Sequence, residues 1–491
     1  MVNLGLPIRL YDAAAVRALD EAAIEHAGVP GLTLMTRAGV AAFRVLCRRW
    51  PGIECIAVVC GQGNNAGDGY VVARLARAAG YRVRVVQIGD PDSLGADARE
   101  CFDAMRAAGV EPLPELAPID TADVVVDALL GTGLTRAVEG PFAVAVERIN
   151  EGAAPVLSID IPSGINATTG QRMGTSVRAA TTITFIGLKQ GLFTADAPQY
   201  TGEVAFDDIG VPQVAYERVR PTASLLELRQ VRNSLRPRSR TAHKGDHGHL
   251  LVIGGAPGFS GAIRLAGEAA ARAGVGLVSV AAHPDVAAVV NTMRPELMAH
   301  AVAGRGDLEP LLARADVVAI GPGLGQSDWA VALFADVLNR GLPLVVDADA
   351  LNLLAADPMY RDDWVLTPHP GEAARLLGVS SADILADRFA AAAELRARYG
   401  GAVVLKGAGS IIAGADVPAV LAHGNPGMGS GGMGDVLTGI IGAFIGQGLT
   451  AEWAARAGAC VHAAAGDRAA ARGERGLLAL DLMPHIRALV N

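Results

Sequence analysis

The chain has 491 residues, of which 51% are hydrophobic and only 4% aromatic, and its formal net charge is −8. This length allows two to four domains, and the small aliphatic composition favours α/β layers over a β-sandwich. The acidic balance excludes the usual signature of a nucleic-acid partner, and five cysteines without a C-x-x-C motif argue against a disulfide framework or a zinc site.

The first half repeats a buried strand, a glycine loop and a helix. The N-terminus lacks the basic-then-apolar order of a signal peptide, so together with the cysteine usage a cytoplasmic location is predicted. Continuous apolar strands between helices indicate a parallel sheet covered on both faces. A helix is expected at 68–80, and strands are expected at 53–61, 81–89, 122–133 and 154–164.

The alternation of strands and helices is interrupted over residues 212–245, a polar and basic segment, and then continues. We therefore place a boundary near residue 220 and predict domains at 1–220 and 221–491. The uncharged run 436–451 is short for a membrane span and rich in glycine, so it is interpreted as a buried helix, with no membrane partner. Further strands are expected at 249–256, 275–282, 315–325, 342–351, 363–372 and 402–412.

Polar side chains follow three strands of the first half. The loop "CGQGNNAGDG" holds G-x-G-x-x-A, a loose dinucleotide fingerprint that alone is weak support for a dehydrogenase. Its Asn64, Asn65 and Asp68 are more polar than such a turn requires. Asp127 and the "DIPSG" segment follow two other strands, and each loop taken alone could simply be a polar turn. Asn, Asp and Ser oxygens together suit a hard cation better than zinc.

The second half carries glycines at the carboxyl ends of its strands, where open α/β sheets bind ligands. In "GNPGMGSGGMGDVLTG" (424–439) a glycine loop meets the predicted start of a helix, which suits a phosphate. Asp435 at this point could act as the base in phosphoryl transfer, or simply cap the helix. His369, between two prolines, could likewise only cap a loop. There is no P-loop motif, and "HKGDHGH" (243–249) lacks the companions of a metal site.

The motifs "HKGDHGHLLVIGG", "GPGLG", "VVDADALNLL", "LTPHPGE", "LKGAGS" and "GGMGDVLTG" resemble, in order, the ADP/ATP-dependent NAD(P)H-hydrate dehydratase family. The resemblance spans 225–491 and implies a ribokinase-like fold, with Asp435 as catalytic acid/base. One departure is Gly429-Ser430, where the family more often has Ala-Thr. Glu372 corresponds to a carboxylate that organises Mg²⁺ through water. The implied hydrate-binding residues are Ala262, Gly325, His369 and Asp435. The implied nucleotide-binding residues are Lys406, Gly407, Ala408, Gly409, Ser410 and Gly434.

The motifs "GxGNNxGDG", "DALLGTG" and "DIPSG" resemble the NAD(P)H-hydrate epimerase domain over about residues 1–215, with Thr36 where an acidic residue is more common. The resemblance implies a Rossmann-like fold and a K⁺ site formed by Asn65, Asp127 and Ser163. Asp160 is the candidate acid/base, with Lys189 near the ligand. The implied hydrate-binding residues are Asn64, Asn65, Ala66, Gly67, Asp68, Gly131, Thr132, Gly133, Leu134, Thr135, Arg136, Ala137 and Asp160.

Together the two resemblances imply a cofactor-repair enzyme. Its first domain would epimerise the R and S forms of NADHX and NADPHX, the hydrates of NADH and NADPH. Its second domain would dehydrate the S form while ADP is converted to AMP and phosphate. The fused, bacterial-type arrangement implies ADP over ATP, and the family resemblance implies a homo-oligomer. An alternative is a ribokinase-like small-molecule kinase with a non-catalytic nucleotide-sensing module in front.

Overall fold

The computed structural model describes residues 6–235 and 237–491. The chain divides into two compact units, Met1–Ser224 and Leu225–Asn491. Each unit has its own hydrophobic core. Within the described residues, no helix is long and apolar enough to cross a membrane.

The first unit is built on a seven-stranded sheet in the order β4-β3-β2-β5-β6-β7-β9. All neighbouring pairs are parallel, as the continuous apolar runs indicated. A small satellite pairs β1 (Arg9–Tyr11) with β8 (Leu188–Lys189) and with β10 (Ala223–Leu226). The sheet strands are β2 (Cys55–Cys60), β3 (Arg82–Gln87), β4 (Pro112–Leu113), β5 (Val124–Ala128), β6 (Val156–Ile159), β7 (Thr181–Phe185) and β9 (Glu203–Asp207).

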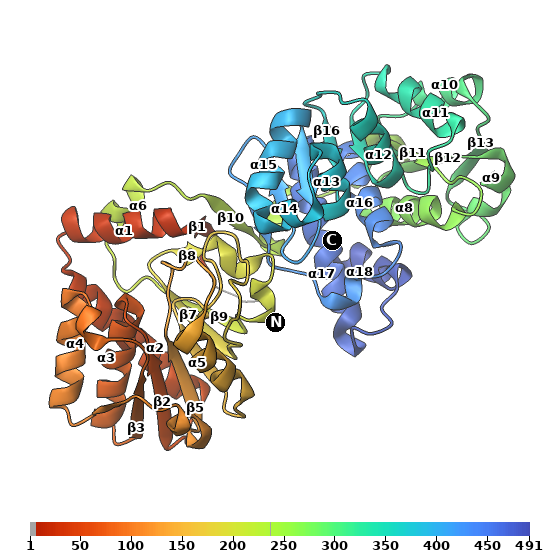
Figure 1. Cartoon of the computed structure of the whole chain (residues 1–491). Helices are drawn as coiled ribbons and strands as arrows, with labels where there is room; N and C mark the ends of the chain where they lie inside the picture. The colour runs from red at the N-terminus through yellow and green to blue at the C-terminus, as the bar shows by residue number, and fades with distance from the viewer. Residues whose placement is uncertain (1–5, 236) are drawn as a thin grey trace. The chain divides into compact units, whose positions relative to one another are not determined.

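Helices cover both faces of this sheet, so the first unit has three layers (Figure 1). Because successive strand residues point to opposite faces, Ile56 and Val58 of β2 join one core cluster and Ala57 and Val59 join the other. The helices α2, α3 and α4 pack on the first face, and α5 packs on the second. The helices are α1 (Ala13–Glu25), α2 (Gly31–Arg49), α3 (Asn64–Ala78), α4 (Ala96–Ala107), α5 (Gly140–Glu151) and α6 (Gln213–Arg218).

The helix expected at 68–80 begins four residues earlier, at Asn64. Gly63 is its N-cap in an extended conformation, and the Ala66 N–H already bonds the Gly63 carbonyl at 3.1 Å. The expectation was wrong because asparagine and glycine are poor helix formers in isolation. Asn64 and Asn65 therefore lie in the first turn of α3, and Asp68 follows in the next turn, on a rigid element at the carboxyl end of β2.

The strands of the second unit follow the order β13-β12-β11-β14-β15-β16-β17-β18-β19. The pairs from β13 to β17 are parallel, and β18 and β19 add antiparallel edges. The single strand expected at 402–412 is two strands joined by the loop 406–410. The strands are β11 (His249–Gly254), β12 (Leu277–Ala282), β13 (Met298–Ala301), β14 (Val317–Ile320), β15 (Leu344–Val346), β16 (Trp364–Leu366), β17 (Ala402–Leu405), β18 (Ile411–Ala413) and β19 (Ala419–Leu421).

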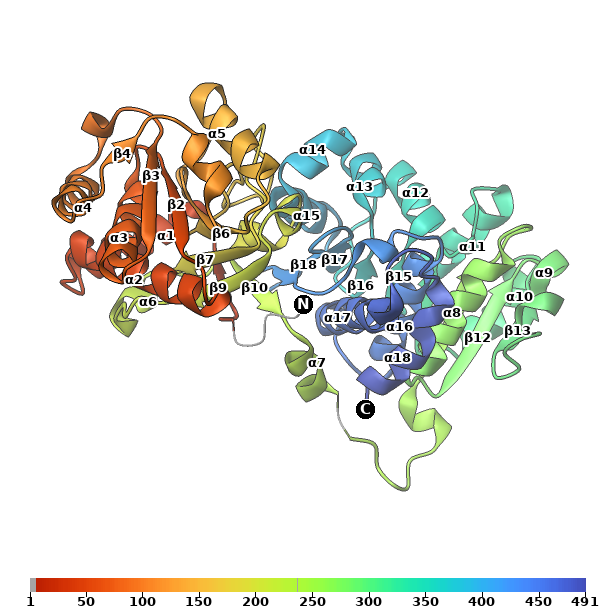
Figure 2. The same ribbon diagram turned by 90° about the horizontal axis from the view of Figure 1, so that it is seen from below.

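The second unit is also three-layered (Figure 2), which confirms the α/β class predicted for both halves. Leu250 and Val252 of β11 join the core of α8 and α16, whereas Leu251 and Ile253 join the core of α11 to α15. The helices are α7 (Leu228–Ser234), α8 (Ser260–Ala273), α9 (Pro284–Val290), α10 (Arg305–Leu312), α11 (Asp328–Leu338), α12 (Ala348–Ala356), α13 (Pro370–Leu377), α14 (Ser381–Ala386), α15 (Arg388–Tyr399), α16 (Met433–Gly446), α17 (Ala451–Ala469) and α18 (Met483–Leu489).

A close helix crossing fixes the position of α16, the helix that carries Asp435. A Cβ on Gly439 would lie 2.0 Å from the Ala266 carbonyl oxygen of α8, so only glycine permits this approach. At the start of the helix, Gly432 is the N-cap with φ +90°, a conformation that other residues rarely adopt. The glycines of the loop thus serve chain geometry as well as ligand access.

Two candidate active sites

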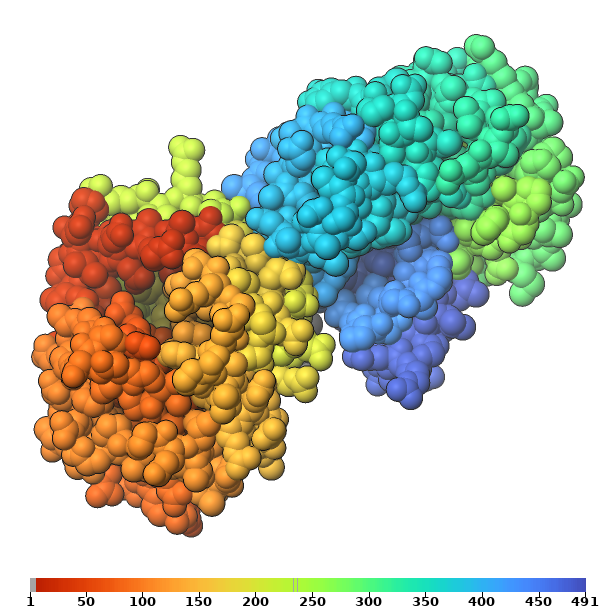
Figure 3. Space-filling view, viewed as in Figure 1, coloured from red at the N-terminus to blue at the C-terminus, as the bar shows by residue number. Residues whose placement is uncertain are grey.

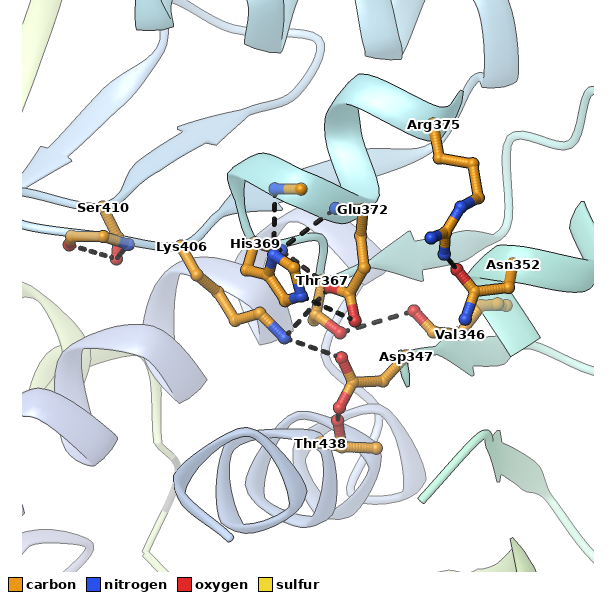
Figure 4. Close-up of polar contacts among 12 residues, drawn as sticks. Val346, Asp347, Asn352, Thr367, His369, Glu372, Arg375, Lys406, Ser410 and Thr438 are labelled. Carbon is orange, nitrogen blue, oxygen red and sulfur yellow. Dashed lines mark hydrogen bonds and ion pairs between the residues drawn. The ribbon is translucent and has the colours of Figure 1, made fainter. Parts of the chain in front are cut away.

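An ion pair lies at the centre of the second unit's site. The Lys406 ammonium at the end of β17 is 2.8 Å from Oδ1 of Asp347, which follows β15 (Figure 4). Thr438 of α16 donates to the other Asp347 oxygen at 2.8 Å. Burial by itself would raise the pKa of Asp347, but Lys406 and the hydroxyl donors lower it. Asp347 is therefore a fixed negative charge that orients Lys406.

Glu372 and His369 adjoin this pair. Glu372 Oε2 is 3.6 Å from the Lys406 ammonium and accepts the His369 backbone N–H at 2.7 Å. His369 Nδ1 accepts the Gly371 N–H at 2.9 Å, so His369 is the N-cap of α13, the simpler of its two interpretations. The other ring nitrogen, Nε2, lies 3.5 Å from Glu372 Oε1, and the His369 side chain is 56% exposed. The loop thus presents one imidazole nitrogen beside a lysine and two carboxylates.

Asp435 is the third residue of α16 and does not cap it, since Gly432 is the N-cap and no side chain bonds the cap position. A Cβ on the preceding Gly434 would lie 3.4 Å from the Lys406 ammonium and 3.5 Å from Asp347 Oδ2. Burial raises the pKa of Asp435 to about 7; the charges of Asp347 and Asp349 add to this effect, and Lys406 opposes it. A carboxylate poised near neutrality is suited to proton transfer.

The expected substrate residue Ala262 lies in the first turn of α8, and Gly325 lies on the loop that follows β14. A Cβ on Gly323 would be 3.2 Å from that of Ala262, and the Gly325 N–H donates to Asp349 Oδ2 at 2.8 Å. Asp349 is in the first turn of α12 and acts on the pKa of Asp435. Asp349 therefore both binds the backbone at Gly325 and acts on the charge of Asp435.

The loop 406–410 joins β17 to β18 and is held by a side chain that sequence reasoning missed. Arg388 at the start of α15 is 1% exposed and donates to the carbonyls of Leu405, Lys406, Ala408 and Gly409, with distances of 3.1, 3.2 and 3.1 Å to the first, second and fourth. Ser410 lies at the far end of this loop, away from the ion pairs (Figure 4). Arg388 thereby holds the carbonyls of this loop in place at the start of α15.

We expect Arg388→Lys to loosen this loop. A lysine ammonium cannot reproduce the planar fork of the guanidinium, so buried carbonyls lose their donors at a cost of about 1–3 kcal/mol. The Michaelis constant for the nucleotide should rise at least tenfold while that for the hydrate changes little. Steady-state kinetics checks this, with Arg398→Lys on the same helix, where the arginine is exposed, as the matched control. An unchanged nucleotide constant would contradict the prediction.

The first unit contains a cavity of about 990 Å³, visible as a hollow between α1 and the segment that follows β5 (Figure 3). This volume is at the upper end of the range for small-molecule sites, about 300–1,000 Å³. Ala66 and Gly67 do not line it, because they face inward on α3; a Cβ on Gly67 would lie 2.2 Å from Met35 Sδ. The other expected hydrate-binding residues line it: Asn64, Asn65, Asp68, the segment 131–137 and Asp160.

Asp160 is fixed at the floor of the cavity. It follows β6 with φ +69°, a strained conformation for a residue with a side chain. Oδ1 is ion-paired with Lys189, which is 1% exposed and also donates to the Phe185 carbonyl at 3.0 Å. Oδ2 would be 3.7 Å from a Cβ on Gly131. One carboxylate oxygen is therefore held and the other faces the 131–137 segment.

Asp127 and Ser163 form a second polar cluster below this cavity. Asp127 is fully buried, and its oxygens accept the Ser163 hydroxyl at 2.5 Å, the Ser163 N–H at 2.9 Å and the Ser158 hydroxyl at 2.8 Å. The Asn65 amide nitrogen donates to the Leu130 carbonyl at 3.0 Å, while its Oδ1 is buried without a hydrogen-bond partner among the residues that the structure describes. Between residues 6 and 491, with residue 236 aside, no group of three His, Cys, Asp or Glu residues could hold a metal ion.

Comparison with protein families accounts for both units. A model described as NAD(P)H-hydrate dehydratase matches residues 250–487, and one described as the YjeF-related protein N-terminus matches residues 31–191. The bifunctional NAD(P)H-hydrate repair enzyme of Coxiella burnetii is 49% identical over 485 residues, covering 98% of this chain and 99% of that protein. The chain belongs to the bifunctional NAD(P)H-hydrate repair enzymes. Both resemblances stated from the motifs are thereby confirmed.

Solved structures similar to this chain cover about half of it and show the fold of its second unit. A ribokinase-like superfamily protein of Enterococcus faecalis has a TM-score of 0.50 and 27% identity, covering 54% of this chain and 94% of its own. This match confirms the predicted ribokinase-like fold. The ADP/ATP-dependent NAD(P)H-hydrate dehydratase of Bacillus subtilis, co-crystallised with ATP and Mg²⁺, is 28% identical with a TM-score of 0.49, covering 54% and 97%.

The repair-enzyme motifs identified strand ends but missed several groups in the two sites. Asp347 and Asp349 belong to "DADALN", whose position after a strand was a usable signal. Arg388 and Thr438 gave no signal, because an arginine or threonine inside a helical pattern usually faces solvent or the core. Asp20 of α1 also lines the first cavity and was not anticipated.

Proposed function

We propose that the two sites perform successive steps of NAD(P)H-hydrate repair. The chain is a bifunctional enzyme, an epimerase joined to a nucleotide-dependent NAD(P)H-hydrate dehydratase. We assign epimerisation of the R and S hydrates to the cavity of the first unit, and dehydration of the S hydrate to the Asp435 cluster. The observation that carries the second assignment is a half-buried carboxylate with a pKa near 7, beside a paired lysine at a helix N-terminus.

In the dehydratase site, Asp435 accepts the proton of the hydrate's C6 hydroxyl as that oxygen attacks the terminal phosphorus of the nucleotide. Lys406, the 406–410 loop and the backbone N–H groups of α16 hold the negative charge on the phosphates. The ring nitrogen then expels phosphate from C6, and C5 loses a proton, which restores the reduced nicotinamide. ADP leaves as AMP, and the transferred group leaves as phosphate.

Glu372 and the nucleotide fit a Mg²⁺ ion held through water. One Glu372 oxygen is bound to the His369 N–H and faces Lys406, whereas Oε1 lies 3.5 Å from His369 Nε2 and accepts no hydrogen bond from the described residues. Carboxylate, water and phosphate oxygens are the ligands that Mg²⁺ takes in proteins. Such an ion neutralises charge on the phosphates.

The cluster below the first cavity fits K⁺. Asn65 Oδ1 is an oxygen without a donor, and the buried Asp127 carboxylate has no lysine or arginine partner among the described residues. Ser163 adds a hydroxyl oxygen, so the set is made of oxygens alone, as a hard cation requires. The ion would hold α3, the segment after β5 and the segment after β6 in place below the hydrate.

If this site binds K⁺, the salt should stabilise the first unit. Binding to the native state alone raises stability by RT ln(1 + [K⁺]/Kd), about 2.7 kcal/mol at a hundredfold excess over Kd. We expect its thermal unfolding to shift upward with KCl and much less with LiCl at equal ionic strength. Ser163→Ala should abolish the difference, whereas Ser93→Ala, on an exposed turn, should keep it. Equal shifts for both salts would contradict the K⁺ assignment.

The family assignment also supports proposals on nucleotide preference, cellular location and oligomeric state. We infer a preference for ADP over ATP, a cytoplasmic location and a homo-oligomer.

The decisive assay follows recovery of nicotinamide absorbance from mixed hydrate epimers with Mg²⁺ and either ADP or ATP. Complete recovery with ADP supports both sites and the nucleotide preference. Recovery that stops after the S epimer, beyond spontaneous exchange, would leave the first unit as a binding module. No recovery with either nucleotide would favour the small-molecule kinase of the same fold.

A further inference from the structure

One face of α1 forms a wall of the first cavity. Val16, Asp20 and Ile24 are spaced four residues apart, so they lie on the same side of the helix, and all three line the cavity. Val16 and Leu19 pack over Gly187, whose Cβ would lie 3.3 and 3.0 Å from their side-chain carbons. The helix is thereby fixed above the carboxyl end of β7. Arg17 of the same helix also lines the cavity, and Asp20 is the one carboxylate that α1 contributes to it.

The carboxylate of Asp20 does not contribute to the fold through a polar contact with the described residues. Within residues 6–235 and 237–491 no hydrogen bond or ion pair engages it, unlike Asp12 of the same segment, which caps α1 through the Ala15 N–H at 2.7 Å. Burial raises the pKa of Asp20 to about 6; Lys189 opposes this, and Asp160 and Glu21 add to it. A carboxylate kept in such surroundings without a partner destabilises the fold, which is typical of functional groups.

Two charged groups that line the cavity, Lys189 and Asp160, act on the pKa of Asp20. The cavity is also lined by Arg17, Asp97, Arg136 and Glu139. Asp160 is tied to Lys189 on the floor, at the carboxyl end of β6. The pKa of Asp68, on α3, is raised by burial and then by Asp160 and Asp20, while Lys189 opposes this. Asp20 and Asp160 therefore belong to different walls of one cavity, and the ring of a bound hydrate can lie between them.

Inversion at C6 by loss and return of the hydroxyl group uses both faces of the ring. The C6–O bond breaks as an acid on that face gives its proton to the hydroxyl, which leaves as water while the ring nitrogen lone pair forms C6=N⁺. Water then adds to the opposite face, the new C6–O bond forms, and a base on that face takes the proton. Carboxylates on two walls supply one such group to each face.

We propose that Asp20 is a second catalytic acid–base group of the first site, acting on the ring face opposite to that served by Asp160. This inference rests on the proposed epimerase function of the first unit. Asp20 and Asp160 exchange roles between the two directions of the reaction, so that after each inversion one proton has moved from one carboxylate to the other and returns through solvent.

The test uses the full chain, each purified hydrate epimer and H₂¹⁸O, with the uncatalysed rates subtracted. Inversion is followed by chromatography of the epimers, and ¹⁸O uptake at C6 by mass spectrometry. In Asp20→Asn we expect inversion to fall at least 100-fold, while ¹⁸O still enters one epimer with retention through Asp160. Asp160→Asn should allow uptake only into the other epimer. The Asp435 site should remain active in both variants.

Glu21→Gln is the matched control, since Glu21 is the next residue of α1, is exposed and does not line the cavity. Asp20→Asn should be at least as heat-stable as the wild type, because it removes an unpaired charge; a structural role would lower the unfolding temperature. Asp20→Ala serves as a second variant with the same expectation for inversion.

Inversion at the wild-type rate in Asp20→Asn and Asp20→Ala would overturn the proposal. Loss of ¹⁸O uptake from both epimers in Asp20→Asn would overturn the assignment of one carboxylate to each face. A wild-type protein that inverts neither epimer would remove the proposed epimerase function, and this inference with it.

Discussion

Asp435→Asn should lower the rate of hydrate-dependent phosphate release by about 10²–10⁴-fold, the usual contribution of a positioned base. The amide keeps the shape of the side chain but cannot accept the hydroxyl proton. Nucleotide binding should persist, because Lys406 and the 406–410 loop are unchanged. Epimer exchange in the first unit should continue at the wild-type rate, which serves as an internal control for folding of the protein.

The acid–base role of Asp435 also predicts a pH profile. As a base it must be ionised, and burial raises its pKa to about 7, so kcat/KM for dehydration should fall as the pH drops below 7. Stability has the opposite dependence: because the folded state holds this proton more tightly, the group's contribution to stability declines from pH 4 to pH 7. Asp435→Asn should remove this decline and unfold at the same or a higher temperature. Undiminished phosphate release in the variant would refute the assigned role.

Lys406→Met should destabilise the second unit by about 3–5 kcal/mol, because it leaves the buried Asp347 carboxylate without its cation. Urea denaturation followed by a probe in the second unit measures this loss. Hydrate dehydration should also disappear, since Lys406 is the cation beside the proposed phosphate position. The exposed Lys244 offers a matched control, and Lys244→Met should change neither quantity.

A double-mutant cycle separates the charge pair from the loss of a side chain. Adding Asp347→Asn to Lys406→Met removes the uncompensated charge, so we expect the double variant to regain about 0.5–3 kcal/mol relative to the sum of the single changes. Additive losses would mean that the two groups act independently in the folded state. The activity should not return in the double variant, because the cation is still missing.

Much of the fold could be predicted from the sequence because the relevant signals are local. Apolar runs such as 249–256 identify buried strands, and "GGMGDVLTG" identifies a glycine loop ahead of a helix. Local signals were weaker where propensity opposes the final structure. Asn64 to Gly67 form the first turn of α3 because the neighbouring helices and β2 stabilise it, although their own preference is for a loop.

The sequence by itself determined the two α/β units, the family, the segment that carries Asp160 and the helix start that carries Asp435. Only the tertiary structure decided which charges meet. Lys406 and Asp347 are 59 residues apart, Arg388 reaches a loop about 20 residues away, and Asp20 shares a cavity with Asp160. The physical reason is that periodicity and backbone preference act over a few residues, whereas strand order and helix crossings such as Gly439 on Ala266 set the distances between distant side chains.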